Sequence, residues 1–291
     1  MGFRTVKINN RCKLETSLGY LVCRTDKETK ILLDEISILI IENQQACITS
    51  ALLAALMEHK VRVVICNDKH NPGGELVPYC SCYDTPAKIQ KQLNWNEDIK
   101  DAVWQKIVKQ KILNQALVLK YMKKDESYEL LLKYYDEVTS GDTTNREGLA
   151  AKSYFAALFG NGFDRRSPKF EVNTYLDYGY SILCSAVNRS VSIYGYLSMV
   201  GIHHKGQQNP YNLGCDLMEP FRPFIDLAIL NMDLNKDNFK RLLIDVLSTL
   251  VSYDDKNTIF DNAISFYVLD VLKALNSGDL MQIKELKFPN D

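Results

Sequence analysis

Tyr83-Asp84-Thr85-Pro86 separates two parts of the chain that have different sequence patterns. Before it, short apolar and β-branched runs lie between polar turns, which is typical of strands. After it, apolar residues recur at spacings of three to six with lysines between them, which is typical of amphipathic helices. We therefore predict an α+β protein. A small N-terminal β-domain with one helix would span residues 1–82, and a larger all-α domain would span residues 83–291.

The N-terminal part contains one departure from its strand pattern. Leu52, Leu53, Leu56 and Met57 form the apolar face of a helix predicted over residues 49–59, with Thr49 or Ser50 as its N-cap. Asn67 to Gly74 has the residue types of a turn. The predicted strands around these segments are residues 4–8, 19–23, 36–41 and 61–66.

The C-terminal part is predicted to be helical almost throughout. A further helix would contain Glu147, after the turn Gly141-Asp142-Thr143-Thr144, and residues 284–291 would form a loose tail. The other predicted helices are residues 95–121, 127–138, 173–197, 213–230, 237–250 and 261–275.

The composition excludes several classes of protein. The chain has 291 residues, of which 46% are hydrophobic, and its formal charge is −1, so it lacks the strongly basic composition of many nucleic-acid binders. The eight cysteines include no C-x-x-C pair, which argues against a zinc ribbon. No signal-peptide core and no membrane-spanning apolar run are present, so we expect a cytoplasmic protein with reduced thiols and no membrane contact.

Candidate metal ligands gather between Gly201 and Pro223. His203 and His204 lie in a glycine-bounded polar loop, which leads to Asp216 and Glu219. The two acidic residues are three positions apart and would share one face of a helix. Imidazole and carboxylate groups together suit a divalent cation.

Other interpretations of these residues remain open from the sequence alone. Glu147 fits a capping box that begins at Thr144, in which its side chain would bond the N-cap amide. Asp216 and Glu219 could form a solvated helix face, and the histidines could be surface residues. No phosphate-binding glycine loop, nucleophile elbow or H-E-x-x-H motif is present. A carboxylate–histidine metal site is therefore one hypothesis among several.

The order of several motifs resembles the CRISPR-associated spacer-acquisition integrase, the Cas-one family, and in particular its type II branch. The similarity covers nearly the whole chain. The motifs that carry it are residues 145–155, 176–180, 201–204 and 216–223, with weaker matches at residues 4–6, 38–42 and 66–69.

This resemblance implies a metal triad and an assembly. Glu147, His204 and Glu219 match the family's catalytic metal ligands, and the Gly-x-x-His pattern favours His204 over its neighbour His203. Asp216 would support the site, and the metal would be Mg²⁺ or Mn²⁺. The implied fold is a β-domain, which would mediate dimerisation, and a helical catalytic domain.

The resemblance also implies a reaction and its partners. A prespacer 3′-hydroxyl end would join the CRISPR repeat by transesterification, with a homodimer bound to a small dimeric protein of the Cas-two family and to double-stranded DNA. A type II accessory adaptation protein and the effector nuclease are further possible partners. The candidates for DNA contacts are Lys152, Tyr154, Lys205 and Arg222, although Arg222 could instead pair with Asp216 or Asp226.

Two other functions fit the same residues. A standalone metal-dependent nuclease acting on branched DNA would run the reverse chemistry at the same site. A non-catalytic scaffold that bridges DNA ends would need no metal triad, so the presence of all three residues favours an enzyme.

Overall fold

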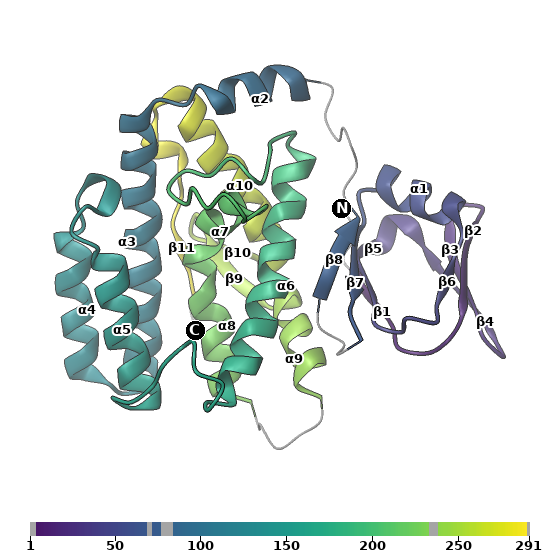
Figure 1. Cartoon of the computed structure of the whole chain (residues 1–291), viewed down its shortest axis with the longest axis horizontal. Helices are drawn as coiled ribbons and strands as arrows, with labels where there is room; N and C mark the ends of the chain where they lie inside the picture. The colour runs from purple at the N-terminus through teal and green to yellow at the C-terminus, as the bar shows by residue number, and fades with distance from the viewer. Residues whose placement is uncertain (1–3, 69–71, 77–83, 233–237, 290–291) are drawn as a thin grey trace. The chain divides into compact units, whose positions relative to one another are not determined.

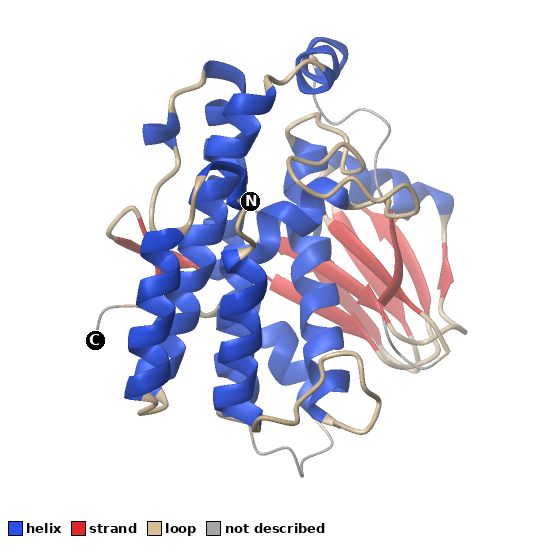
Figure 2. Ribbon diagram, turned by 60° about the vertical axis from the view of Figure 1, so that its left-hand side comes forward, coloured by secondary structure: helices blue, strands red, loops and turns tan. Residues whose placement is uncertain are grey.

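The computed structural model describes residues 4–68, 72–76, 84–232 and 238–289, and the chain divides into two compact units, residues 1–81 and 82–291. Each unit is drawn in Figure 1 with its helices and strands labelled. The α+β prediction is confirmed: strands dominate the first unit and helices dominate the second (Figure 2).

The N-terminal unit consists of two four-stranded sheets and one helix. In the first sheet the order is β1-β5-β7-β8, with β1, β5 and β7 parallel and β8 antiparallel to β7. In the second the order is β4-β3-β2-β6. The strands are β1 (Arg4–Ile8), β2 (Lys13–Ser17), β3 (Tyr20–Arg24), β4 (Glu28–Leu32), β5 (Ile36–Ile41), β6 (Cys47–Ile48), β7 (Arg62–Cys66) and β8 (Pro72–Leu76), with the 3-10 turn η1 (Leu33–Glu35) before β5.

The core of this unit explains why its central strand is so apolar. All six residues of β5 are buried, as expected for a strand with a parallel neighbour on each side. Helix α1 (Ser50–Glu58) adds Leu52 and Leu56 to the same core. Thr49 is its N-cap, and the threonine hydroxyl accepts a hydrogen bond from the Leu52 amide at 3.3 Å. This cap was predicted.

One segment of the N-terminal unit differs from the prediction. Residues 72–76 form strand β8, which pairs with β7, whereas the sequence predicted turn residues through Gly74. Gly73 and Gly74 are compatible with a paired strand as well as with a turn. The residue types alone therefore did not distinguish a strand from a turn. The adjoining residues 69–71 lie outside the described part of the chain.

The C-terminal unit is built around two long helices, α3 (Glu97–Tyr121) and α6 (Val172–Ile193). Helices α4 (Asp125–Glu137) and α5 (Arg146–Phe159) pack against α3, as Figure 1 shows. The remaining helices pack largely against α6: α7 (Asn212–Met218), α8 (Arg222–Leu230), α9 (Phe239–Asp245) and α10 (Phe260–Ser277). Helix α2 (Thr85–Leu93) precedes α3.

The single helix predicted over residues 213–230 is interrupted. Helix α7 ends at Met218, a 3-10 turn, η3 (Glu219–Phe221), follows, and α8 begins at Arg222. Pro220 and Pro223 have no amide hydrogen to donate, and each lies near the start of its element, where that donor is not needed. The interruption places Glu219 in the turn rather than on the same helix as Asp216.

The C-terminal unit also contains a small sheet that the sequence did not predict. Strands β9 (Leu250–Tyr253), β10 (Lys256–Ile259) and β11 (Leu286–Lys287) pair in the order β10-β9-β11. The predicted helix over 237–250 therefore ends early, with α9 and the 3-10 turn η4 (Val246–Ser248) before β9. Part of the predicted loose tail is β11, and it follows another 3-10 turn, η5 (Leu280–Gln282). No described helix combines the length and the apolar character needed to cross a membrane.

Candidate functional site

Two of the three predicted metal ligands, Glu147 and Glu219, meet at Lys111. The Nζ atom of Lys111, on α3, forms an ion pair with Glu147 Oε1, near the start of α5. The same Nζ lies 2.5 Å from Glu219 Oε2, in η3. Helices α3 and α5 and the turn η3 pack together, so three separate elements bring these groups to one point.

Glu219 carries a second cation on its other oxygen. Its Oε1 lies 2.9 Å from Arg222 NH2, so the carboxylate lies between Lys111 and Arg222. Burial alone would raise the pKa of Glu219, but the charges of Arg222 and Lys111 outweigh it and hold the pKa below its ordinary value. The ion pair of Arg222 is thus with Glu219, whereas the sequence offered Asp216 or Asp226 as alternatives to DNA.

Glu147 is not the capping residue that its sequence motif suggested. Asn145 is the N-cap of α5, and its side chain accepts a hydrogen bond from Gly148 N at 3.2 Å. The carboxylate of Asp142 accepts the amides of Arg146 and Glu147, each at 2.9 Å. Because these two residues satisfy the first amides of α5, the Glu147 side chain is free to reach Lys111.

His204 is oriented by Asp216. The Nδ1 atom of His204 lies 2.6 Å from Asp216 Oδ1, and this carboxylate also accepts the backbone amides of residues 202, 203 and 204 at 2.6–3.1 Å. Asp216 is fully buried, so the interpretation of it as part of a solvated helix face is wrong. The hydrogen bond that the His204 ring donates to Asp216 raises the pKa of His204, although burial alone would lower it.

This contact leaves the other ring nitrogen of His204, Nε2, without a hydrogen-bond partner among the described residues. A carboxylate on Nδ1 is the arrangement that fixes metal-binding histidines with Nε2 available. Gly201 is required for the loop, since a Cβ there would lie 2.8 Å from Asp216 Oδ2 and would collide with the carbonyl oxygen of His204.

His203 has a different environment. Its ring stacks on Trp104 of α3, with centroids 4.4 Å apart and planes 3° from parallel. His204 meets the edge of the same Trp104 ring. The stacking holds the face of the His203 ring against α3.

The four candidate DNA-contacting residues lie in different environments. Lys152 and Lys205 are exposed, and Lys205 forms a 3.4 Å ion pair with Glu97. Arg222 is largely occupied by Glu219 and by the face of Tyr180, whose centroid is 4.7 Å from its guanidinium carbon. Tyr154 is fully buried, so its prediction as a DNA contact is wrong.

A buried carboxyl group explains the position of Tyr154. Its hydroxyl donates to Asp226 Oδ2 at 3.0 Å, and the hydroxyl of Tyr180 donates to Asp226 Oδ1 at 2.6 Å. Burial raises the pKa of Asp226 to about 6, despite these hydrogen bonds and the nearby Arg222 charge. The sequence offered Asp226 only as a partner for Arg222.

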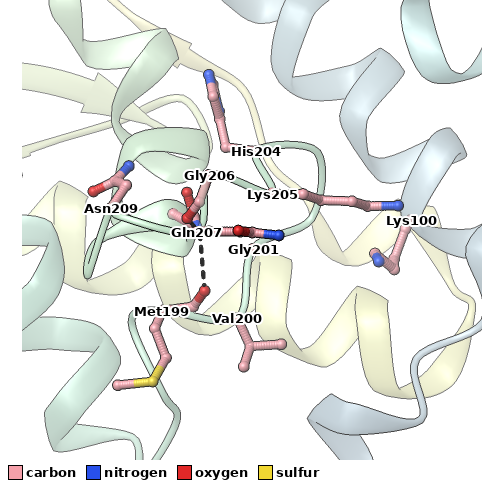
Figure 3. Close-up of a pocket in the computed structure, with 10 residues that line it drawn as sticks. Lys100, Met199, Val200, Gly201, His204, Lys205, Gly206, Gln207 and Asn209 are labelled. Atoms are coloured by element: carbon pink, nitrogen blue, oxygen red, sulfur yellow. Dashed lines mark hydrogen bonds between the residues drawn. The ribbon is translucent and has the colours of Figure 1, made fainter.

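A pocket of about 420 Å³ opens beside His204. Figure 3 shows the Lys205 side chain extending toward the helix that carries Lys100. Asn212 braces the pocket wall by donating to the carbonyls of Met199 and Gly206 at 3.1 and 2.9 Å. The residues that line the pocket are Lys100, Met199, Val200, Gly201, His204, Lys205, Gly206, Gln207, Asn209 and Asn212.

The donor groups suit a divalent cation in their chemistry. Two carboxylates and an available imidazole nitrogen match the ligands that Mg²⁺ and Mn²⁺ accept. Glu219 Oε2 supports this fit, because it is buried and already faces a cation, the ammonium of Lys111. Within the described residues, however, no three His, Cys, Asp or Glu side chains converge as a ready-made metal cluster, and Lys111 lies between the two carboxylates.

Lys111 is the residue of this site that the sequence analysis missed. It follows Val103 and Ile107 at spacings of four, so it lies on the buried face of α3. A lysine that continues the buried apolar positions Val103 and Ile107 was the signal, since such a charge needs a buried partner.

Comparison with known proteins identifies the family. The family model described as "CRISPR associated protein Cas1" matches residues 8–242. A curated relative from Neisseria meningitidis serogroup C, named CRISPR-associated endonuclease Cas1, is 40% identical over 234 residues, which is 80% of this chain and 76% of the relative.

Solved structures share the fold. A casposase bound to an integration product superposes with a TM-score of 0.77 at 19% identity, covering 96% of this chain and 92% of that one. A partial Cas6-RT-Cas1–Cas2 complex gives a TM-score of 0.67 at 21% identity and covers both chains completely.

These matches extend over both units of the chain, and the N-terminal strands and C-terminal helices recur in the related structures. The resemblance read from the sequence motifs is confirmed, and so is the prediction of an enzyme, at the level of the family and the endonuclease name of its curated members. The chain belongs to the CRISPR-associated Cas1 family.

Proposed function

We propose that this protein is a metal-dependent DNA integrase of CRISPR adaptation. It would join the 3′-hydroxyl ends of a prespacer to the CRISPR repeat by transesterification. Glu147, His204 and Glu219 would be its metal ligands and Asp216 the residue that positions His204.

The convergence of Glu147 and Glu219 on one cation carries this proposal. The two carboxylates come from different elements and share Lys111 Nζ, so their arrangement already supports a positive charge. Two carboxylates facing one point in a largely buried place repel each other unless a cation lies between them. The oriented His204 supplies a third donor in the same unit.

The proposed reaction exchanges one phosphodiester bond for another. The 3′ oxygen of the prespacer forms a new bond to phosphorus, the bond from phosphorus to the 3′ oxygen of the repeat breaks, and the departing oxygen takes up a proton as the attacking hydroxyl loses one. Mg²⁺ or Mn²⁺ at the three ligands would supply Lewis-acid stabilisation of charge on the phosphoryl oxygens.

The protein's own groups would position the DNA. Lys205 is exposed beside the pocket, and with Lys100 it provides positive charge at the pocket next to His204. A phosphate of the DNA end suits such a pocket, because ammonium groups bind phosphate as point charges. Lys152, which is exposed on α5, would contact a DNA phosphate farther from the bound end.

The proposed partners follow from the family and from the related structures. The titles of those structures name an integration product in one case and a Cas1–Cas2 complex in the other. We propose that this chain likewise binds double-stranded DNA and a small dimeric partner of the Cas-two family, as a cytoplasmic homodimer whose contacts come from the N-terminal unit.

A strand-joining assay tests the proposed function. Wild type and Glu147→Ala, each with the small partner, would be incubated with Mn²⁺, a short duplex with 3′-hydroxyl ends and a plasmid that carries a repeat. We expect wild type to join strands and Glu147→Ala to lose at least about 10²-fold in rate, the loss typical when a group that stabilises transition-state charge is removed. Glu129→Ala, at an exposed position of α4, is the matched control and should join like wild type.

The products separate the alternatives. Equal joining by wild type and Glu147→Ala would remove Glu147 from the site. Cleavage without joining would favour the branched-DNA nuclease. DNA binding without either reaction would favour the scaffold.

A further inference from the structure

Lys111 is almost completely buried, and both of its partners are proposed metal ligands. Its side chain is 7% exposed, and its Nζ contacts Glu147 Oε1 and Glu219 Oε2. Glu219 is 5% exposed and Glu147 is 29% exposed, so the carboxylate of Glu147 is the more open side of this cluster. A solvated lysine on a helix surface would not have this environment.

The cluster is electrically balanced without a metal. Lys111 and Arg222 carry two positive charges, and Glu147 and Glu219 carry two negative charges. A divalent cation at the same carboxylates would leave the cluster with an excess of two positive charges. It would also compete for the position that the Lys111 ammonium holds, since one point between two carboxylates accepts one cation.

We propose that Lys111 is an internal counter-ion. Its ammonium group occupies the metal position between the two carboxylates and leaves that position only when DNA binds. This inference rests on the proposed function, because it assigns the metal to Glu147 and Glu219. On metal binding the ammonium leaves both carboxylates and pairs with a phosphate of the DNA.

The structure indicates why the two events are coupled. An ammonium that loses its partners inside a protein is costly unless another anion replaces them. Each phosphodiester brings one negative charge and several acceptor oxygens to the site, and lysine has a flexible four-carbon stem that can redirect its charge. Metal and DNA should therefore bind cooperatively, and each should raise the affinity for the other by the same factor.

The test measures Mn²⁺ binding rather than activity. Free Mn²⁺ would be followed by its electron paramagnetic resonance signal during titration of the full-length protein, with and without a short branched DNA duplex. We expect wild type to bind Mn²⁺ weakly alone and at least about tenfold more tightly with DNA, a factor worth about 1.4 kcal/mol. Lys111→Met should bind Mn²⁺ at least about tenfold more tightly than wild type without DNA, and DNA should add little.

Lys106→Met is the matched control. Lys106 lies on the same helix and is half-buried, and its Nζ donates to the carbonyl of Leu280 at 2.9 Å rather than to a proposed ligand. Its removal should leave Mn²⁺ binding without DNA unchanged. Glu147→Gln should weaken Mn²⁺ binding both with and without DNA.

The outcomes separate this inference from the proposed function. If Lys111→Met and wild type bind Mn²⁺ equally and respond equally to DNA, the counter-ion role is wrong and the metal site stands. If Glu147→Gln binds Mn²⁺ as wild type does, the site itself is wrong, and the role of Lys111 is wrong with it. Should Lys111→Met fail to fold, Lys111→Gln replaces it. In wild type, equal Mn²⁺ affinity with and without DNA is sufficient to reject the coupling.

Discussion

Asp226 is a single residue with a measurable effect on the pH dependence of stability. Its carboxyl group is buried between the hydroxyls of Tyr154 and Tyr180, and burial raises its pKa from 3.8 to about 6. The folded state therefore keeps a proton that the unfolded state loses at lower pH. Stability contributed by this group is fully present below pH 3.8 and is lost as the pH rises through about 6.

We expect Asp226→Asn to remove this dependence. The difference between the two pKa values corresponds to about 3 kcal/mol, so the free energy of unfolding of wild type, relative to the variant, should fall by about that amount between about pH 3 and about pH 7. Urea unfolding of both proteins across this range measures the difference. A difference that is constant or grows with pH would contradict the assignment.

At the residue scale, motif resemblance predicted more than physical patterns did. Glu147 and Glu219 were recognised from their motifs, and the structure brings them together, but no local pattern could show that a lysine lies between them. Hydrogen bonding by Asp142 and Asn145 also overrode the capping box expected for Glu147. Such contacts depend on which helices become neighbours, and this information is not local in the sequence.

Helix α2 is the element that anchors the histidine loop. Gln92, which is 2% exposed, donates to the carbonyls of Leu197 and Val200 at 2.8 and 2.9 Å and accepts the Leu197 amide at 2.9 Å. One side chain thus satisfies three backbone groups just before Gly201. The position of His204 depends in part on this contact with a helix more than a hundred residues earlier.

Gln92→Leu should therefore loosen the loop without removing any proposed ligand. Buried backbone groups left without partners cost about 2–4 kcal/mol in total, which should appear as a lower free energy of unfolding. Amide hydrogen exchange at Leu197 should also become faster. Gln90→Leu, at an exposed position of α2, is the control, and equal exchange in both variants would show that α2 does not anchor the loop.

At the element scale, long periodic segments were predictable and short strands were not. Helices α1, α3, α4 and α10 begin and end within a few residues of their predicted bounds, because each has a continuous apolar face. The pairing of β9 with β10 and β11 was missed, since β9 and β10 have four residues each and β11 has only two. Distant pairing partners decide such strands, rather than local preference.

For the whole molecule, the proposed DNA binding would depend on local charge. The formal charge of −1 gives no general attraction to a polyanion, so each exposed lysine near the proposed site would carry a large share of the binding. Lys205, with a side chain that is 69% exposed, is the clearest case.

Lys205→Ala should lower the salt sensitivity of DNA binding. Loss of one phosphate contact reduces the slope of log K against log salt concentration by about 0.9. Fluorescence anisotropy with labelled duplex at several salt concentrations measures the slope. Lys133→Ala, at an exposed position of α4, should leave the slope unchanged, and the same slope in both variants would exclude a phosphate contact at Lys205.

The pairing of strand β11 has a consequence for synthesis on the ribosome. Gln110, one position before Lys111, bonds both the carbonyl and the amide of Leu286, at 2.9 and 3.2 Å. All sheet pairings of the N-terminal unit, in contrast, are made by residues up to Leu76. At about 5–20 residues per second, the first unit has a head start on the order of 10–40 s before Leu286 is made. The β-unit can therefore fold while the helix that carries Lys111 still lacks one of its neighbours, and the surroundings of the proposed metal site are among the last parts of the nascent protein to be completed.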